Sequence, residues 1–129
     1  FVGGFLIVLV VVLYGIASSY KTNSTFPSKV NVKDAYQMRE SGAFVLDVRE
    51  QSEWDEAHIP DATLIPLGEL ERRLDEVPKE QEIIVVCRTG NRSAKARDIL
   101  LAAGFKKVAS MTGGMNAWKL NKFETVSEN

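Results

Sequence analysis

Short apolar segments alternate with helical patterns along most of this chain, and this alternation constrains its fold more than any other feature. The clearest apolar segment, Ile83-Ile84-Val85-Val86, is β-branched and has the length of a buried strand. After a short loop, a helical pattern runs from Ser93 to Ala103 and ends at Gly104. Strands that alternate with helices form a parallel sheet with helices on both faces. The sequence therefore predicts an α/β fold.

The remaining elements continue this alternation. We predict strands at residues 29–30, 44–47, 63–65, 82–86 and 107–110. We predict further helices at residues 32–40, 52–57, 68–77 and 115–120. Asn31 can cap the first of these helices, and Leu67, Leu70 and Leu74 recur at helical spacing before a stop at Pro78.

The single cysteine, Cys87, directly follows the strand that ends at Val86. Ligands of parallel sheets bind beyond the carboxyl ends of the strands, and N–H groups in such a loop and in the next helix's first turn favour an anion there. Together with Arg88 and Arg92 they would hold the pKa of the thiol low. Gly90 lacks a Cβ and permits the positive φ that a tight loop requires. We predict that Cys87 reacts as a thiolate nucleophile, and we call residues 87–92 the cysteine loop.

Two more loops follow strands at the same predicted edge of the sheet. Asp47 and Arg49 lie at the end of one strand, and Thr112-Gly113-Gly114 follows another. Because parallel strands end at a common edge, we expect these loops and the cysteine loop to form one pocket rim. The two glycines would permit close approach of the backbone.

Composition excludes several classes of function. At 129 residues the chain suits one domain, and 16 basic against 17 acidic residues give no electrostatic case for nucleic acid. One cysteine excludes an internal disulfide and an internal resolving thiol. One cysteine and one histidine, His58, fall short of a metal-ligand set. No glycine pattern of a nucleotide site follows any strand, so we expect neither metal nor cofactor.

The amino-terminal segment differs from the rest of the chain. Residues 1–17 carry no charge, and the first charged side chain is Lys21. A stretch of this length can span a bilayer, so we predict one hydrophobic helix at 1–20 that anchors the protein in a membrane. The alternative is a secretory signal cleaved after Gly15-Ile16-Ala17, which would leave an exported or periplasmic protein. Residues 21–28 would form a linker, 29–124 the domain and 125–129 a tail.

Four motifs resemble those of the rhodanese family, sulfurtransferases that carry sulfane sulfur as a cysteine persulfide. The cysteine loop resembles the family's active-site loop, and residues 44–50 resemble its strand that ends in aspartate and arginine. Residues 53–66 are similar to the family pattern E-(aromatic)-x-x-G-H-I-P-G-A-x-N-I-P, and residues 113–118 to its closing G-G-x-x-A-W. The motifs occur in family order across most of the predicted domain.

The resemblance implies a single-domain rhodanese-type sulfurtransferase with the fold described above. Cys87 would accept sulfane sulfur from thiosulfate or a similar donor and pass it to cyanide, a cellular thiol or an unidentified protein acceptor. Asp47 and Arg49 would be a structural pair that braces the loop. His58 would be structural and not a general base. The implied substrate-binding residues are Arg88, Thr89, Gly90, Asn91, Arg92 and Ser93, with Arg92 the first choice for a donor oxyanion and Arg88 the second.

Three positions depart from the family pattern, and two other functions stay open. Ala57 and Asp61 replace glycines, and Leu64 stands where the family often has asparagine. Arg92 follows Cys87 by five positions, the spacing of sulfur-transferring members, whereas the related phosphatases have one residue more. The alternatives are a cysteine-dependent phosphatase or arsenate reductase, and a non-catalytic binding module with the same fold.

Overall fold

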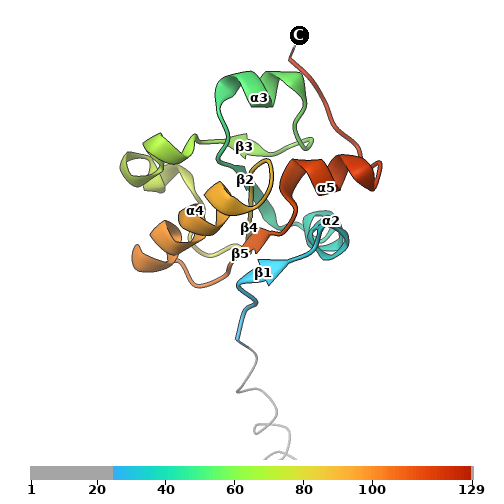
Figure 1. Cartoon of the computed structure of the whole chain (residues 1–129). Helices are drawn as coiled ribbons and strands as arrows, with labels where there is room; N and C mark the ends of the chain where they lie inside the picture. Colours follow the sequence, from blue (N-terminus) through green and yellow to red (C-terminus); the bar gives the residue numbers. More distant parts are fainter. Residues whose placement is uncertain (1–24, 129) are drawn as a thin grey trace, which may run out of the picture.

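The computed structural model describes residues 25–128, which form one five-stranded parallel sheet with helices on both faces (Figure 1). The strand order is β1-β5-β4-β2-β3, and every paired strand is parallel. The strands are β1 (Lys29–Val30), β2 (Phe44–Asp47), β3 (Thr63–Leu64), β4 (Ile83–Val86) and β5 (Val108–Met111). The predicted α/β fold with a covered parallel sheet is confirmed.

Helices connect the strands at the places that the sequence predicts, with one exception. The α-helices are α2 (Val32–Glu40), α3 (Gln51–Glu56), α4 (Asn91–Ala102) and α5 (Gly114–Leu120). The Asn31 side chain caps α2 by accepting a hydrogen bond from the Asp34 N–H at 2.8 Å. Helix α4 begins two residues earlier than predicted, because Gly90 adopts a left-handed conformation immediately before it.

The exception is the predicted α-helix at 68–77, which is wrong. This stretch forms two 3₁₀ helices, η1 (Leu67–Arg72) and η2 (Leu74–Glu76). Leu67 and Leu70 are three apart, which suits a helix with three residues per turn, and the ion pairs of Arg72 with Glu69 and of Arg73 with Glu76 have the same spacing. Leu70 is the one fully buried residue of η1, and η1 packs against α4.

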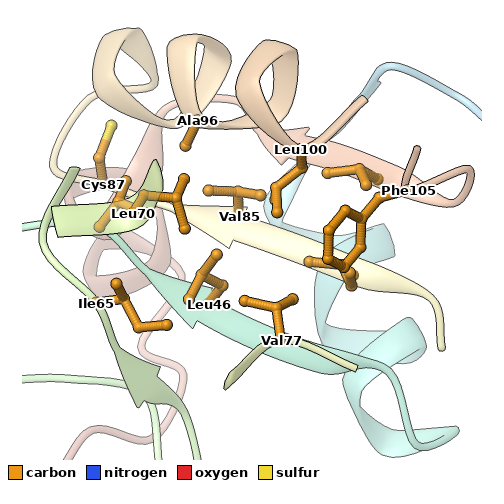
Figure 2. Close-up of a cluster of buried hydrophobic side chains, with 12 residues drawn as sticks. Leu46, Ile65, Leu70, Val77, Val85, Cys87, Ala96, Leu100 and Phe105 are labelled. Carbon is orange, nitrogen blue, oxygen red and sulfur yellow. The ribbon is translucent and has the colours of Figure 1, made fainter. Parts of the chain in front are cut away.

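The core lies in two layers, one on each face of the sheet, as alternate side chains of the strands require. Val45, Ile84 and Val86 face α2 and α5, where Trp118 is the largest buried side chain. Leu46 and Val85 face α4 and η1 (Figure 2). Cys87 continues the second layer at its end, and its sulfur points toward the first turn of α4 (Figure 2).

The described chain begins inside the predicted linker. The Ser28 carbonyl accepts hydrogen bonds from the Ser110 N–H at 2.9 Å and from Arg97 at 3.0 Å, and Phe26 packs against the core. The predicted membrane helix or signal at 1–20 lies outside the described residues. Within residues 25–128, no helix has the length and apolar character that crossing a membrane requires.

Candidate active site

The cysteine loop forms at the carboxyl end of the central strand β4. Cys87 is 1% exposed, and the Gly90 N–H donates a hydrogen bond to its Sγ at 3.0 Å. Gly90 has a φ of +116°, the left-handed region that favours glycine. This conformation turns the Gly90 N–H inward, so the loop backbone holds the sulfur from one side.

Hydrogen bonds hold the pKa of the Cys87 thiol below its usual value. Burial raises this pKa, and the Ser93 hydroxyl together with the backbone N–H groups of Ser93, Gly90 and Thr89 outweighs that effect. The hydrogen bonds, and not the charges of Arg88 and Arg92, account for most of the lowering. The site therefore favours the thiolate, the reactive form of cysteine.

Two buried serines lie beneath the sulfur. Ser93, in the first turn of α4, is fully buried, and its Oγ lies 3.5 Å from Cys87 Sγ. Its hydroxyl donates to the Gly90 carbonyl at 3.0 Å. Ser110 on β5 is 2% exposed, and its Oγ lies 2.7 Å from the Ser93 Oγ. The sulfur thus belongs to a chain of hydroxyl groups that reaches the neighbouring strand.

The start of α5 supports the cysteine loop from behind. The Met115 N–H donates to the Cys87 carbonyl at 2.8 Å, and the Asn116 N–H donates to the Arg88 carbonyl at 3.1 Å. Gly114 has a φ of +54°, and a Cβ on it would overlap the Cys87 and Arg88 backbone. Only glycine fits this contact between the two loops.

A pocket opens over the cysteine loop, and most of its lining side chains are charged. Its lining comprises Arg49, Glu53, Glu56, Arg88, Arg92, Met115, Asn116 and Lys119. These residues come from the end of β2, from α3, from the cysteine loop and from α5. Two of the three predicted strand-end loops, those of Arg49 and of the cysteine loop, line this pocket. Residues 112–114 do not line it, and the third side comes instead from Met115, Asn116 and Lys119 of α5.

Two of the pocket arginines are held in ion pairs. Arg92 forms two hydrogen bonds with the Glu53 carboxylate, at 2.6 and 2.8 Å, which lower the pKa of Glu53 to about 2 and raise that of Arg92. Buried Arg49 contacts buried Asp47 at 2.8 Å and also donates to the Ala57 carbonyl at 2.8 Å. Asp47 and Arg49 therefore tie the end of β2 to the segment after α3.

The other two cations of the pocket are Arg88 and Lys119. Neither side chain forms an ion pair or a hydrogen bond with any other of residues 25–128. Both residues are exposed. Their charges are therefore available to an anion that enters the pocket.

A family model for the rhodanese-like domain matches residues 31–121. The chain belongs to the rhodanese-like family. Among curated relatives, it is 31% identical over 91 residues to the thiosulfate sulfurtransferase GlpE of Pseudomonas syringae, a match that covers 70% of this chain and 86% of that protein. It is 45% identical over 74 residues to the putative sulfur carrier protein YrkF of Bacillus subtilis. That match covers 57% of this chain and only 40% of YrkF.

Solved rhodanese-like structures share the fold. A rhodanese-related protein from Thermoplasma volcanium is 29% identical with a TM-score of 0.72, over 78% of this chain and 98% of that one. The human single-domain sulfurtransferase TSTD1 is 25% identical with a TM-score of 0.69, over 76% of this chain and 99% of that one. The rhodanese-like domain thus accounts for the described sheet and helices.

Two of the three departures from the rhodanese pattern have a local backbone explanation, and Leu64 has none. Ala57 has a φ of −167°, an extended conformation that any residue adopts, so a glycine is not required there. Asp61 has a φ of +65°, where glycine is favoured and aspartate is one of the better-tolerated alternatives. Leu64 belongs to β3 and pairs with Asp47 of β2. None of the three residues lines the pocket.

The structure brings together only some of the predicted site residues. Gly90 and Ser93 contact the sulfur, and Arg88 and Arg92 line the pocket. Thr89 and Asn91 have exposed side chains outside that lining, although the backbone N–H of Thr89 contributes to lowering the pKa of the Cys87 thiol. The substrate-binding roles of these residues stay predictions.

His58 lies apart from the pocket. Its ring stacks on Trp54 with centroids 3.5 Å apart, and its Nδ1 lies 2.8 Å from the Trp54 carbonyl oxygen. The backbone of His58 pairs with that of Val126. This geometry fits the structural role that the family resemblance implies.

The sequence analysis missed several site residues: the pocket residues Glu53, Glu56, Met115, Asn116 and Lys119, and Ser110 beneath the loop. Glu53 stands in a recognised motif, but nothing in that motif names Arg92 as its partner. Ser110 carries a usable signal, because it is the one polar residue of the buried strand β5. Lys119 follows the last family motif and carries no signal of its own.

Proposed function

We propose that this protein is a sulfurtransferase that carries sulfane sulfur as a persulfide on Cys87. The observation that carries the proposal is the environment of the Cys87 thiol. Its Sγ accepts a hydrogen bond from the inward-facing Gly90 N–H, and its pKa is lowered. Relatives that are named sulfurtransferases, such as GlpE of Pseudomonas syringae, support the same reaction class. Thiosulfate is the donor that this relative's name suggests.

In the first step, the Cys87 thiolate attacks the outer sulfur of thiosulfate. A new S–S bond forms on Cys87, and the S–S bond within thiosulfate breaks as sulfite leaves with the electron pair. No proton has to be removed from the donor, so a general base is unnecessary. The loop N–H groups, such as that of Gly90, are already directed at the sulfur and would stabilise the negative persulfide.

In the second step, an acceptor removes the outer sulfur. Cyanide or a thiolate attacks it, the S–S bond on Cys87 breaks, and Cys87 returns as a thiolate. The products are thiocyanate or the persulfide of the acceptor. Because the chain has one cysteine, no second thiol of the same chain can take the sulfur.

Arg88 and Lys119 are the cations we assign to the sulfonate end of the donor. Arg92 lines the same pocket, but two hydrogen bonds engage its guanidinium with Glu53. A donor that bound Arg92 would have to share it with this carboxylate. The side chains of Arg88 and Lys119 meet no such competition from residues 25–128.

Intact mass of the full chain before and after thiosulfate tests the proposal. A gain of one sulfur atom, about 32 Da, that cyanide then removes is the expected result. The Cys87→Ser variant should show no gain and no transfer of sulfur to cyanide. Wild-type transfer by that variant would overturn the mechanism.

The low exposure of Cys87 makes a non-catalytic binding module the second candidate function. At 1% exposure, the thiol meets a donor only if neighbouring side chains move. Failure of Cys87 to take sulfur from thiosulfate, polysulfide and an organic persulfide would favour this candidate. Hydrolysis of an aryl phosphate that requires Cys87 would instead favour a phosphatase.

We also propose that residues 1–20 anchor the domain to a membrane. Their uncharged composition supports this, since the first charged residue is Lys21. The full chain should then stay with membranes after an alkaline carbonate wash. Recovery of a shortened chain from the soluble fraction would support a cleaved signal instead.

A further inference from the structure

Ser110 places a hydroxyl group in the apolar interior behind the cysteine loop. It lies in β5 between Ala109 and Met111, and all three residues are buried. A buried hydroxyl costs free energy unless it is hydrogen-bonded. Among residues 25–128, the one hydrogen-bond partner of the Ser110 Oγ is the Ser93 Oγ, at 2.7 Å.

Counting hydrogens gives this bond a direction. Each serine hydroxyl has one hydrogen, and that of Ser93 is directed at the Gly90 carbonyl at 3.0 Å. Ser110 therefore donates and Ser93 accepts. The reverse direction would leave the Ser110 hydrogen buried without an acceptor in the described structure, which costs free energy.

The ionisation of Cys87 decides where the Ser93 hydrogen points. While the sulfur carries its proton, the thiol can donate to the Ser93 Oγ at 3.5 Å. Once the sulfur is a thiolate, it becomes a stronger acceptor than the Gly90 carbonyl, and the Ser93 hydrogen can turn to it. Ser110 donates to Ser93 in both states, so the Ser93 hydroxyl stays polarised by a second hydroxyl.

We propose that Ser110 is a positioning residue that makes Ser93 a hydrogen-bond donor to the Cys87 thiolate. Its hydroxyl polarises that of Ser93, which strengthens the hydrogen bond that Ser93 donates to the sulfur and so favours the thiolate. The catalytic meaning of this inference rests on the proposed function, in which the thiolate is the nucleophile. Ser110 itself touches neither the sulfur nor the pocket.

The charged side chains around the cysteine loop line the pocket. They are Arg49, Glu53, Glu56, Arg88, Arg92 and Lys119. Among residues 25–128, no charged side chain forms a hydrogen bond with Ser93 or Ser110. Removing the Ser110 hydroxyl should therefore change the thiolate without changing the ion pairs of the pocket.

Two matched pairs of full-length proteins test the proposal: wild type with Ser110→Ala, and Ser110→Thr with Ser110→Val. Thr and Val have the same shape and differ in the hydroxyl, so the second pair remains informative if Ser110→Ala folds poorly. The readout is the ultraviolet absorbance of the Cys87 thiolate against pH, with Cys87→Ser in each background as the baseline. Removing the hydroxyl should raise the pKa by about half a unit to one unit in each pair.

Val108→Ala is the control for a purely structural effect. Val108 is buried on the same strand and the same face as Ser110, and the variant keeps both hydroxyls. It should destabilise the protein and leave the pKa of Cys87 unchanged. Equal pKa values within both test pairs, or a lower pKa without the hydroxyl, would overturn the proposal. The titration uses no sulfur donor, so its result is independent of the persulfide experiment.

Discussion

Arg92 and Glu53 show how a single partner changes what a residue can do. Arg92 stands in the cysteine loop, where a free guanidinium would bind an oxyanion. In the structure it pairs with a carboxylate 39 positions away, through two hydrogen bonds. Both side chains are about one-third exposed or less, so water screens the pair only in part. The pair fastens α3 to the start of α4.

Replacing Glu53 with Gln should change stability in a pH-dependent way. The folded protein lowers the pKa of Glu53 from 4.5 to about 2, so the stabilisation is fully present above pH 4.5 and is lost as the pH falls toward 2. At neutral pH, Glu53→Gln should lower the free energy of unfolding by about 1 kcal/mol, a value reduced for solvent screening. Urea unfolding at several pH values measures this.

Glu56→Gln is the matched control for the ion pair. Glu56 lines the same pocket but forms no ion pair with residues 25–128. Its variant should unfold within about 0.5 kcal/mol of wild type. If Glu53→Gln retained the acid dependence of wild type between pH 4.5 and 2, the Arg92 pair would not be its source.

At the scale of elements, the cysteine loop depends on the helix that follows the next strand. Helix α5 begins with Gly114, whose left-handed conformation lets the Met115 and Asn116 N–H groups reach the loop carbonyls. The start of α5 therefore helps to shape the cysteine loop, although α4 and β5 separate the two in the sequence. A change at the start of α5 should therefore alter the backbone of Cys87 and Arg88.

Gly114→Ala should destabilise the protein strongly. The new Cβ would overlap the backbone of Cys87 and Arg88, and alanine disfavours a φ of +54°. We expect a loss of about 3 kcal/mol or more in the free energy of unfolding, measured by urea titration. Gly68→Ala is the control, because a Cβ there meets nothing within 4 Å. Equal stability of the two variants would contradict this role of Gly114.

The cap of α2 gives a second prediction for a single element. The Asn31 side chain accepts a hydrogen bond from the Asp34 N–H at 2.8 Å at an exposed helix end. Asn31→Ala should cost about 1 kcal/mol of stability, measured by thermal or urea unfolding. Asn31→Asp keeps an acceptor oxygen, and its free energy of unfolding should lie within about 0.3 kcal/mol of wild type. A similar loss in both variants would mean that the cap is not the cause.

At the scale of the whole molecule, the end of the described chain packs against α3 and the residues that follow it. The backbones of His58 and Val126 exchange two hydrogen bonds of 2.9 Å, and the Glu128 N–H donates to the Asp55 carbonyl at 2.9 Å. Trp118 donates from its ring nitrogen to the Glu124 carbonyl at 2.9 Å. The predicted tail therefore contacts the same segment that carries Glu53 and the carbonyl partners of Arg49.

Ending the chain after Glu124 should destabilise the fold. The two hydrogen bonds to the buried residue His58 and the one to Asp55 would be lost, at a cost of about 1–3 kcal/mol. Ending the chain after Val126 retains the His58 pairing and should cost less than half as much. Urea unfolding of the three lengths measures this. Identical midpoints would show that the tail adds nothing to the domain.

The sequence by itself determined the order of strands and helices, the parallel sheet and the position of Cys87 at a strand end. These features follow from periodicity, from apolar runs and from local signals such as Asn31 and Gly90, all of which act over a few residues. The resemblance of four motifs added the family, and the match of the rhodanese-like family model to residues 31–121 confirms it.

Only the tertiary structure decided which distant side chains meet. The pairing of Arg92 with Glu53, the contact of Ser110 with Ser93 and the approach of Gly114 to the Cys87 carbonyl join residues from different elements. The 3₁₀ form of residues 67–72 and 74–76 also lay beyond the sequence pattern, because leucines three and four apart suit either helix. Partners are set by the three-dimensional arrangement of strand ends, which local sequence patterns do not encode.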